Sequence, residues 1–439
     1  MHESKKKLFR RLCPLVIWLL GSSAMWAQTP APNQNELIER LLQRVDQLEK
    51  RVAELESGRP VAQAVEPPRA EVPAQPGPVS SVLTPNQPPP GPGAHDHEHG
   101  GTALEPASTY PSLRLSGFGD INFTASQQPG SKSGFNEGQL VPHISSALSS
   151  RVTYFAELSI TARTDAGTGT PPAAGFNLEV ERNFIRFDQS DYFKISFGRF
   201  HTPISYWNTT FHHGSWLQTA AQRPVSIEFG GSFMPIHFLG ALGEGAVPAG
   251  GLNLNYYAGI GNGRSSVLSR AGDFGAVNNA KAWLAGGFLK PDWAYGLQVG
   301  ASIYKDKIDA IGKPEAREWI QSAHIVWTRE NPEFIAEFFN INHAAPGVGF
   351  NTSSQAWYAQ VGWRLSFADR WKPYYRYEHV HIPQADPVFH GTVASFYGST
   401  VGVRYDISSY AAFKLEYRNQ SLFGVKNFNS VWAQTDFTF

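Results

Sequence analysis

The chain has 439 residues, of which 17% are charged, and its 37 Lys and Arg residues balance 37 Asp and Glu residues. The charged fraction lies below the roughly 25% of an average soluble domain, and the absence of net charge argues against nucleic acid as a partner. Beyond the N-terminal leader, no segment has the ~18 consecutive apolar residues of a membrane-spanning helix. A membrane location therefore requires a β-barrel.

The first 27 residues have the parts of a secretory signal peptide. Basic residues precede an apolar run at 12–20, and small residues follow as far as Ala27. This order predicts a signal peptide over 1–27, cleaved after Ala24 or, as we prefer, after Ala27; the run is too short for the alternative, an uncleaved anchor helix. The single cysteine, Cys13, lies inside this segment. The mature chain is therefore expected to have no disulfide, cysteine nucleophile or thiolate metal site.

A heptad pattern over residues 33–57 predicts a coiled coil. Its apolar positions, spaced alternately by three and four residues, are Ile38, Leu41, Val45, Leu48, Val52 and Leu55. β-branched residues at a with Leu at d are typical of parallel dimers. However, segments 44–49 and 51–56 resemble the Arg-apolar-x-x-apolar-Glu signature of short trimeric coils, so we favour three strands. A single amphipathic helix packed on a neighbour is the alternative.

Residues 58–109 are rich in Pro, Ala and Gly and lack helical or strand periodicity, which predicts a linker. The linker contains a His tract formed by His95, His97 and His99, with acidic residues between them. Imidazoles and carboxylates can hold Zn²⁺ or Ni²⁺, although this tract has no neighbouring groups to orient its ligands. The alternative is a polar low-complexity segment without a specific role.

Over residues 110–439 the hydrophobic pattern has a period of two. In one segment, one face holds Phe413, Leu415 and Tyr417, and the other holds Lys414, Glu416 and Arg418. Such alternation suits a strand between lipid and a watery lumen. Sixteen such segments can be placed, near 112–125, 138–149, 151–164, 176–188, 191–201, 235–246, 250–263, 280–290, 293–306, 317–328, 332–344, 354–365, 371–382, 397–406, 410–421 and 427–439. The sequence therefore predicts an all-β fold, a 16-stranded antiparallel transmembrane β-barrel with the coiled coil as an N-terminal stalk.

The connections between these segments alternate in length. Short turns such as 188–191 and 290–292 are separated by longer loops at 126–137, 165–175, 202–234, 264–279, 307–316, 345–353 and 383–396. An outer-membrane barrel has tight periplasmic turns and longer external loops. An even number of strands then places both ends of the barrel segment, and with them the stalk, on the periplasmic side.

The C-terminal residues resemble the signal that bacterial outer-membrane proteins present to their assembly machinery. Val431, Ala433, Thr435, Phe437 and Phe439 share one face of the last segment. The resemblance implies that the assembly machinery is a partner through Phe439. Aromatic residues near segment ends fit the girdles at a membrane interface. They include Trp293, Tyr295, Trp319, Trp327, Trp363, Trp371, Tyr374 and Tyr375.

In length, strand number, loop rhythm and terminal Phe, residues 110–439 resemble Gram-negative porins. With the stalk, the chain is most similar to the superfamily of the phosphate-selective porins O and P. This resemblance implies an outer-membrane, water-filled channel for passive diffusion of small hydrophilic solutes or ions, surrounded by outer-membrane lipid. It also implies a homotrimer held through the barrel and the coiled coil. In such porins the third long loop, here 202–234, folds into the lumen and narrows it.

Two sets of candidate site residues follow. The expected pore constriction comprises Arg199, Tyr206, Trp207, His212, His213, Trp216, Arg223 and Glu228. The expected pore lining comprises Arg114, Asp120, Arg151, Glu157, Arg163, Arg404, Lys414, Glu416 and Arg418. Because the lining mixes both signs of charge, we expect a general or weakly selective pore and not phosphate selectivity; cross-strand structural pairs are the alternative role. The alternation breaks over 180–186, so no facing is predicted for Glu181, Arg182 or Arg186.

Other functions remain open at this point. The sequence contains no G-x-S-x-G or H-E-x-x-H motif, and neither an enzyme nor a cofactor is expected. A divalent-metal uptake channel would use His95, His97 and His99, and a structural tether to the cell wall would use the stalk and linker. Within the loop, the adjacent His212 and His213 raise the possibility of a metal site, but adjacent side chains on a strand point apart, which argues against it. Tyr206, Trp207 and Trp216 suggest an aromatic path for sugars.

Overall fold

The structure, a computed structural model, describes Lys50 and residues 110–163, 175–228, 233–268, 277–347, 351–422, 424 and 427–439. The predicted signal peptide, the linker with its His tract and, apart from Lys50, the predicted coiled coil lie outside the described residues. Among the residues that are described, no helix is long and apolar enough to cross a membrane.

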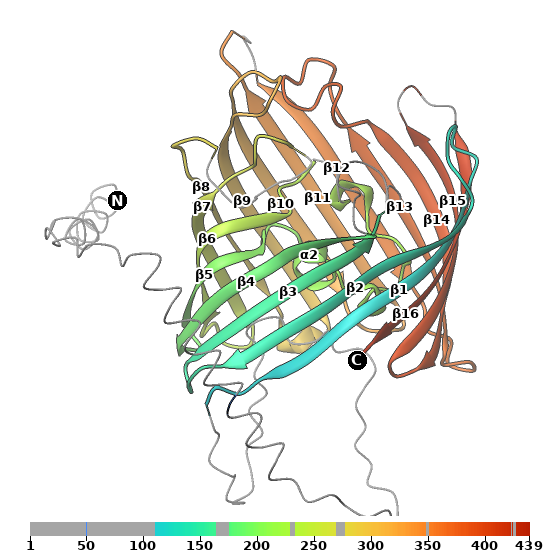
Figure 1. The fold of residues 1–439 in the computed structure, drawn as a ribbon, viewed down its shortest axis with the longest axis horizontal. Helices are drawn as coiled ribbons and strands as arrows, with labels where there is room; N and C mark the ends of the chain where they lie inside the picture. Colours follow the sequence, from blue (N-terminus) through green and yellow to red (C-terminus); the bar gives the residue numbers. More distant parts are fainter. Residues whose placement is uncertain are drawn as a thin grey trace, which may run out of the picture. The chain divides into compact units, whose positions relative to one another are not determined.

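Sixteen antiparallel strands form one closed barrel, in which β1 pairs with β2 on one side and with β16 on the other (Figure 1). The strands are β1 (Arg114–Ser126), β2 (Gly134–Ala147), β3 (Val152–Ala162), β4 (Phe176–Ser190), β5 (Phe193–His201), β6 (His237–Val247), β7 (Leu254–Asn262), β8 (Ala282–Leu289), β9 (Leu297–Ile308), β10 (Ala316–Trp327), β11 (Glu333–Ala344), β12 (Thr352–Gly362), β13 (Trp371–His381), β14 (Phe396–Ser408), β15 (Ala411–Leu422) and β16 (Phe428–Thr438). All sixteen predicted segments are confirmed. The loop predicted at 126–137 is shorter than expected, because β2 already begins at Gly134.

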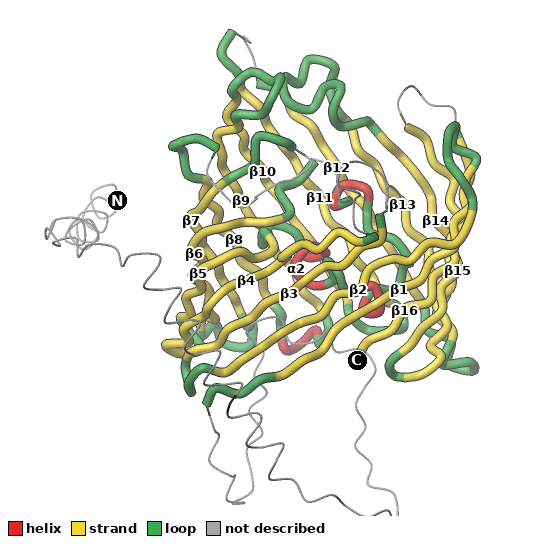
Figure 2. Tube along the Cα trace, in the orientation of Figure 1, coloured by secondary structure: helices red, strands yellow, loops and turns green. Residues whose placement is uncertain are grey.

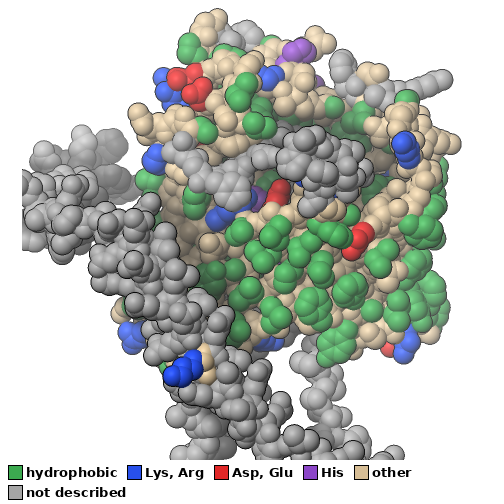
Figure 3. Space-filling view, viewed as in Figure 1, with side chains coloured by type: hydrophobic (Ala, Val, Ile, Leu, Met, Phe, Trp, Pro, Cys, Tyr) green, Lys and Arg blue, Asp and Glu red, His purple; other side chains and the backbone are tan. Residues whose placement is uncertain are grey.

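The alternation of side chains gives the barrel a polar interior and an apolar outer surface. On β15, Phe413, Leu415 and Tyr417 are 38%, 43% and 51% exposed, whereas Lys414, Glu416 and Arg418 are all buried inside. Figure 3 shows hydrophobic side chains gathered on the outer face of the barrel. This is the reverse of a water-soluble fold and is the polarity expected of a barrel in lipid.

Short turns join the strands at one end of the barrel and longer loops join them at the other. The β4–β5 and β14–β15 connections leave only two residues between strands, whereas 35 residues separate β5 from β6. β1 begins at the short-turn end, where Gly117 N donates a hydrogen bond to the carbonyl of Phe439 at 2.9 Å. Both ends of the barrel segment therefore lie at the short-turn end, as the even strand number requires.

Aromatic residues at the strand ends follow the expected girdle with one exception. Trp293 and Tyr295, beside the β8–β9 turn, are 78% and 74% exposed at the short-turn end of the barrel. Tyr374 is instead buried, and its hydroxyl donates to Glu416 at 2.8 Å in the interior. The assignment of Tyr374 to a girdle was therefore wrong, because in the observed register Tyr375 takes the outward position.

Candidate functional site

The 35 residues between β5 and β6 fold into the interior of the barrel. We call residues 202–236 the lumen loop; 229–232 lie outside the described residues. The loop contains helix α2 (Tyr206–Thr210) and the 3₁₀ turns η2 (Ser215–Leu217) and η3 (Val225–Ile227) (Figure 2). Ser205 caps α2, since its side chain accepts a hydrogen bond from Asn208 N at 3.1 Å.

The start of α2 is held by a carboxylate from the barrel wall. Glu337 on β11 accepts hydrogen bonds from the backbone N–H groups of Tyr206 and Trp207 at 2.6 and 2.9 Å. It also accepts from the hydroxyls of Ser205 and Tyr358 at 3.1 and 2.7 Å. Glu337 thus satisfies amide groups that every helix leaves unpaired at its N-terminus.

Cations on β13, β14 and β15 hold the rest of the loop through its backbone. Arg376 donates to the carbonyl of Gln222 at 2.7 Å, Arg404 donates to that of Trp216 at 2.6 Å, and Lys414 donates to that of Ser215 at 2.6 Å. Carboxylates on the same strands accept from loop N–H groups: Glu416 from Ala221 at 2.7 Å and Glu378 from Val225 at 2.6 Å. The loop is therefore pinned to one side of the barrel.

Next to these strands, the lumen loop and β1, β2 and β16 enclose a small polar cavity of about 250 Å³. We call it the eyelet cavity. Its lining includes five of the predicted site residues, Asp120, His212, His213, Arg223 and Glu228. Between them lie side-chain amides that the sequence analysis did not select, namely Asn122, Gln139, Gln218, Gln222 and Gln434. The eyelet cavity thus presents both signs of charge and several hydrogen-bonding groups to a solute.

A larger cavity of about 620 Å³ lies on the short-turn side of the lumen loop. Its lining includes Tyr206, His201, Arg182 and Lys290, together with residues of the β8–β9 turn. Arg199, the remaining charged residue of the predicted constriction, is buried on β5 and donates to the carbonyl of Val180 and to His237. Arg199 therefore links β5 to its neighbours β4 and β6 next to the loop.

Of the three residues of the predicted aromatic path for sugars, Trp207 faces neither cavity. Trp207 is 0% exposed and packs edge-on against Phe211 and Tyr358, with ring centroids 4.9 and 6.0 Å away. Trp216 is half-buried, with the Arg404 guanidinium 5.7 Å from its ring. The ring of Trp207 is part of the apolar contact between loop and wall and cannot stack on a solute.

The predicted lining residues fall into two groups. Asp120, Glu157, Arg404, Lys414, Glu416 and Arg418 are buried on the inner side of the barrel. Most of them pair with each other, with neighbouring wall residues or with the lumen loop, as in the 2.5 Å contact between Lys414 and Asp436. Arg114 and Arg151 are exposed at the short-turn end, and Arg163 follows the end of β3. These three lie away from the eyelet cavity.

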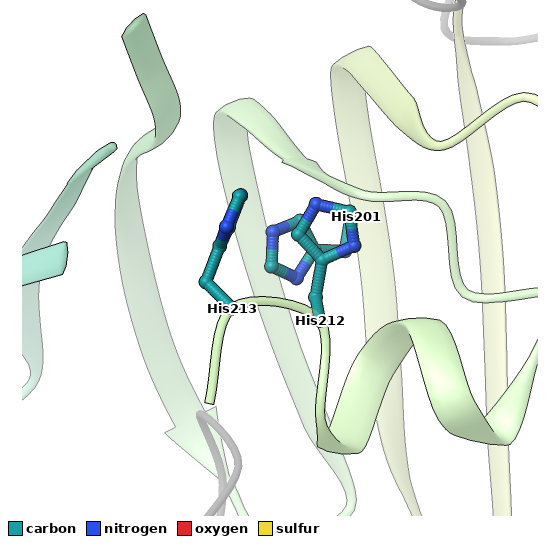
Figure 4. A group of neighbouring side chains, drawn as sticks. All are labelled: His201, His212 and His213. Atoms are coloured by element: carbon teal, nitrogen blue, oxygen red, sulfur yellow. The ribbon is translucent and has the colours of Figure 1, made fainter. Parts of the chain in front are cut away.

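A cluster of four imidazoles lies where the loop meets β4, β5 and β6. Figure 4 shows the rings of His201, His212 and His213 next to one another. His201 ends β5, His237 begins β6, and His212 and His213 follow α2. Burial lowers the pKa of the His212 imidazole well below its usual range, and the adjacent His201 and His213 act in the same direction. The His212 ring is therefore neutral at pH 7.

The sequence analysis missed Glu181, His201 and His237 in this cluster. A β-bulge explains the broken alternation: Glu157 pairs with Arg182 and Leu158 with Val180, which leaves Glu181 as an extra residue on β4. The bulge turns the Glu181 side chain into the interior, where it is 1% exposed. The signal was present as the loss of period two, but the pattern alone could not place the extra residue.

The sequence matches no protein-family model, and it matches no curated protein. Its fold does resemble solved structures. The anion-selective porin from Comamonas acidovorans aligns with a TM-score of 0.53 at 12% identity, over 75% of this chain and 100% of that chain. OmpF of Salmonella typhi, in complex with daunomycin, aligns at 0.51 and 13%, over 74% and 97%. The outer-membrane channel DcaP of Acinetobacter baumannii aligns at 0.50 and 10%, over 75% and 97%. The fold is thus that of the 16-stranded porins.

Proposed function

We propose that this protein is an outer-membrane porin, a water-filled channel for passive diffusion of small hydrophilic solutes or ions. The observation that carries the proposal is a closed 16-stranded barrel with an apolar outer surface, a charged interior and a loop folded into that interior. A barrel of this size has an interior that its own side chains do not fill. The apolar outer surface supports a location in the outer membrane, and the charged interior supports a water-filled pore. We propose a channel for this protein and not an enzyme.

We propose weak ion selectivity. Asp120 and Glu228 share the eyelet cavity with Arg223, so a solute meets both signs of charge at one level. Opposed charges across a lumen create a transverse field, whereas a ring of one sign selects ions. Membership of the phosphate-selective O and P superfamily stays a proposal that rests on the overall resemblance, and this mixed lining supports no transfer of phosphate selectivity.

For the N-terminal part we propose a signal peptide over 1–27, a coiled-coil stalk over 33–57 and a linker over 58–109. The chain enters the barrel at the short-turn end, which in outer-membrane barrels is the periplasmic end, and this supports a stalk in the periplasm. We further propose a homotrimer joined through barrel and stalk, and assembly through Phe439. A tether to the cell wall is compatible with a pore, whereas a metal uptake channel that uses the His tract is less favoured.

Single-channel conductance of the refolded full-length protein in a planar bilayer, with the reversal potential under a KCl gradient, tests this proposal. Stepwise openings in groups of three with a small reversal potential are expected. A strongly shifted reversal potential would overturn weak selectivity and leave the channel intact. The absence of any conductance from correctly folded protein would overturn the porin assignment.

A further inference from the structure

Five buried side chains from four segments of the chain meet beside the lumen loop. They are Glu181 on β4, His201 on β5, His212 and His213 on the loop, and His237 on β6, and each is less than 9% exposed. The carboxylate oxygen Glu181 Oε2 lies 3.2 Å from His213 Nε2, 3.9 Å from His212 Nε2 and 2.7 Å from His237 Nε2. Ligand atoms of His201, His212 and His213 lie within 4.8 Å of one another.

Hydrogen bonds fix which nitrogen of His212 carries the proton. His212 Nδ1 lies 2.7 Å from Asn208 Oδ1. The Asn208 amide cannot be turned round, because its NH₂ group donates to the carbonyls of Thr202 and Ile236 at 3.1 and 2.9 Å. His212 Nδ1 therefore carries the proton and donates it, and Nε2 presents a lone pair to the cluster.

His213 also has a side-chain amide behind its ring, since its Nδ1 lies 2.9 Å from Gln139 Oε1. A side-chain oxygen that fixes the tautomer and orientation of an imidazole is the usual arrangement behind a metal-ligating histidine.

His237 has the opposite polarity. Arg199 lies 3.0 Å from His237 Nδ1, and a guanidinium can only donate, so Nδ1 is the acceptor. The proton of His237 is then on Nε2, which points at Glu181 Oε2. His237 thus donates a hydrogen bond that orients the Glu181 carboxylate. Its Nε2 carries a proton and so has no lone pair with which to bind a metal ion.

We propose that Glu181, His201, His212 and His213 bind one divalent transition-metal ion, with Zn²⁺ as the best match, and that His237 positions Glu181. Zinc–ligand distances of about 2.0–2.2 Å place tetrahedral ligands about 3.3 Å apart. The distances from Glu181 Oε2 to the proposed ligands His213 and His212, 3.2 and 3.9 Å, bracket this value. Neither ring nitrogen of His201 makes a hydrogen bond with the described residues, although Nε2 lies 3.5 Å from Glu157. The neutral His201 ring therefore has a nitrogen lone pair to offer the ion.

The charges around the cluster are balanced. Arg182 pairs with Glu157, and Arg199 donates to the Val180 carbonyl and to His237. Arg223 also donates to the carbonyl of His212 at 2.7 Å. Against these three guanidiniums stand the carboxylates of Glu157 and Glu181 and, in the eyelet cavity beside Arg223, those of Asp120 and Glu228, so an incoming cation meets no excess of positive charge. A set of three imidazoles and one carboxylate suits zinc, nickel and copper better than magnesium or calcium.

The proposed ion would attach the lumen loop to a second side of the barrel. The anchors described above join the loop to β11, β13, β14 and β15, whereas Glu181 and His201 belong to β4 and β5. His201 lines the larger cavity, and His212 and His213 line the eyelet cavity. The cluster therefore lies between the two cavities, and a bound ion would hold the loop in the position that narrows the channel.

Metal content of the folded full-length chain tests the binding. The background protein carries His95→Asn, His97→Asn and His99→Asn, so that the His tract binds no metal in the assay. After equilibration with Zn²⁺ and desalting, elemental analysis is expected to find about one zinc per chain. The double variant His212→Asn and His213→Asn is expected to lose this ion, while the matched control His381→Asn, changed at an exposed strand end, retains it. For His237→Gln we expect an affinity about 10–100-fold weaker, as for other ligand-orienting partners.

Two results would overturn the binding proposal: no retained zinc in the background protein, or equal zinc in the background and the double variant. If the double variant does not fold, the visible spectrum of the Co²⁺-loaded background protein tests whether the metal site exists. Intense tetrahedral d–d bands support the site, and a weak octahedral spectrum refutes it.

The effect on the loop is measured separately, and only this part rests on the proposed channel function. Addition of a chelator is expected to raise the single-channel conductance of the background protein. The double variant should begin at the raised value and stay there. Bound zinc without any response of the conductance would refute the locking of the loop, whereas a folded, zinc-loaded protein that forms no channel would refute the proposed function and leave the metal site standing.

Discussion

The two flanks of the lumen loop are built differently. Toward β11–β15, charged wall residues such as Glu337, Arg376 and Lys414 bond directly to the backbone of the loop. Toward β1, β2 and β16 the loop faces the eyelet cavity, lined by amides and by charges of both signs. The first flank fixes where the loop lies, and the second provides the surface that a solute meets. Substitutions on the first flank should therefore change stability and pore size, and those on the second should change selectivity.

The largest effect is expected from Lys414→Met. Lys414 and Asp436 are both 0% exposed and 2.5 Å apart, so the change leaves a buried carboxylate without its cation. We expect the free energy of unfolding, measured by denaturant titration in detergent, to fall by about 3–5 kcal/mol. The control Lys307→Met breaks an exposed pair with Glu315 and should cost about 0–1 kcal/mol. Equal losses of unfolding free energy in the two variants would contradict the difference between the buried and the exposed pair. Adding Asp436→Asn to Lys414→Met removes the unpaired carboxylate and should restore much of the lost stability.

Glu337→Ala should release the start of α2. Two backbone N–H groups and two hydroxyls lose their acceptor, at a cost of about 1–3 kcal/mol. Because the loss is local to the loop, we expect a larger single-channel conductance and faster proteolysis within 202–236. Glu315→Ala is the matched control. Unchanged conductance in a folded Glu337→Ala protein would show that this carboxylate does not fix the loop.

Asp386, in the β13–β14 loop, bonds to His343 on β11 and Ser354 on β12. Its carboxylate should make the free energy of unfolding depend on pH. Although burial acts to raise it, hydrogen bonds from His343, Phe389 and Ser354 lower the pKa of Asp386 to about 2. A depressed carboxyl pKa stabilises the fold above its unfolded value of about 3.8 and ceases to do so as the pH falls through about 2. Asp386→Asn should therefore cost about 2 kcal/mol at pH 7 and little at pH 2. Unfolding titrations at both pH values measure this, and an equal cost at both would contradict it.

Single charges in the eyelet cavity should have the smallest effects. Arg223→Gln removes the cation beside Asp120 and Glu228, so the reversal potential in a KCl gradient should move toward cation preference. Glu228→Gln should move it the other way. One charge in a watery lumen is worth about 1 kcal/mol, or about fivefold in the permeability ratio. For Glu228→Gln, at an exposed side chain, the unfolding free energy should barely change. Shifts of the same sign in both variants would place these residues outside the conducting path.

The barrel was predictable from sequence because its signals are local. Period-two alternation and turn residues reveal each strand without knowledge of its partner, as on β15, where Lys414 and Glu416 alternate with Leu415. The constriction was predictable in part: Asp120, His212, His213, Arg223 and Glu228 meet at one cavity.

What escaped prediction depends on contacts between distant residues. The Glu337 carboxylate bonds to the Trp207 amide across 130 positions of the chain, and no local pattern encodes such a partner. The burial of Trp207 follows from the same contact. Glu181 was out of reach for a different reason, since one extra residue in a bulge reverses the facing of the residues beyond it.

The wall holds the lumen loop largely through carbonyl and amide groups of the backbone, as in the bonds from Arg376 to Gln222 and from Arg404 to Trp216. These bonds do not depend on which side chains the loop carries. Substitutions such as Gln222→Glu or Gln218→Lys could thus accumulate during evolution while the path of the loop is preserved. A descendant of this protein could acquire a new solute preference by changing loop side chains alone, with its scaffold inherited unchanged.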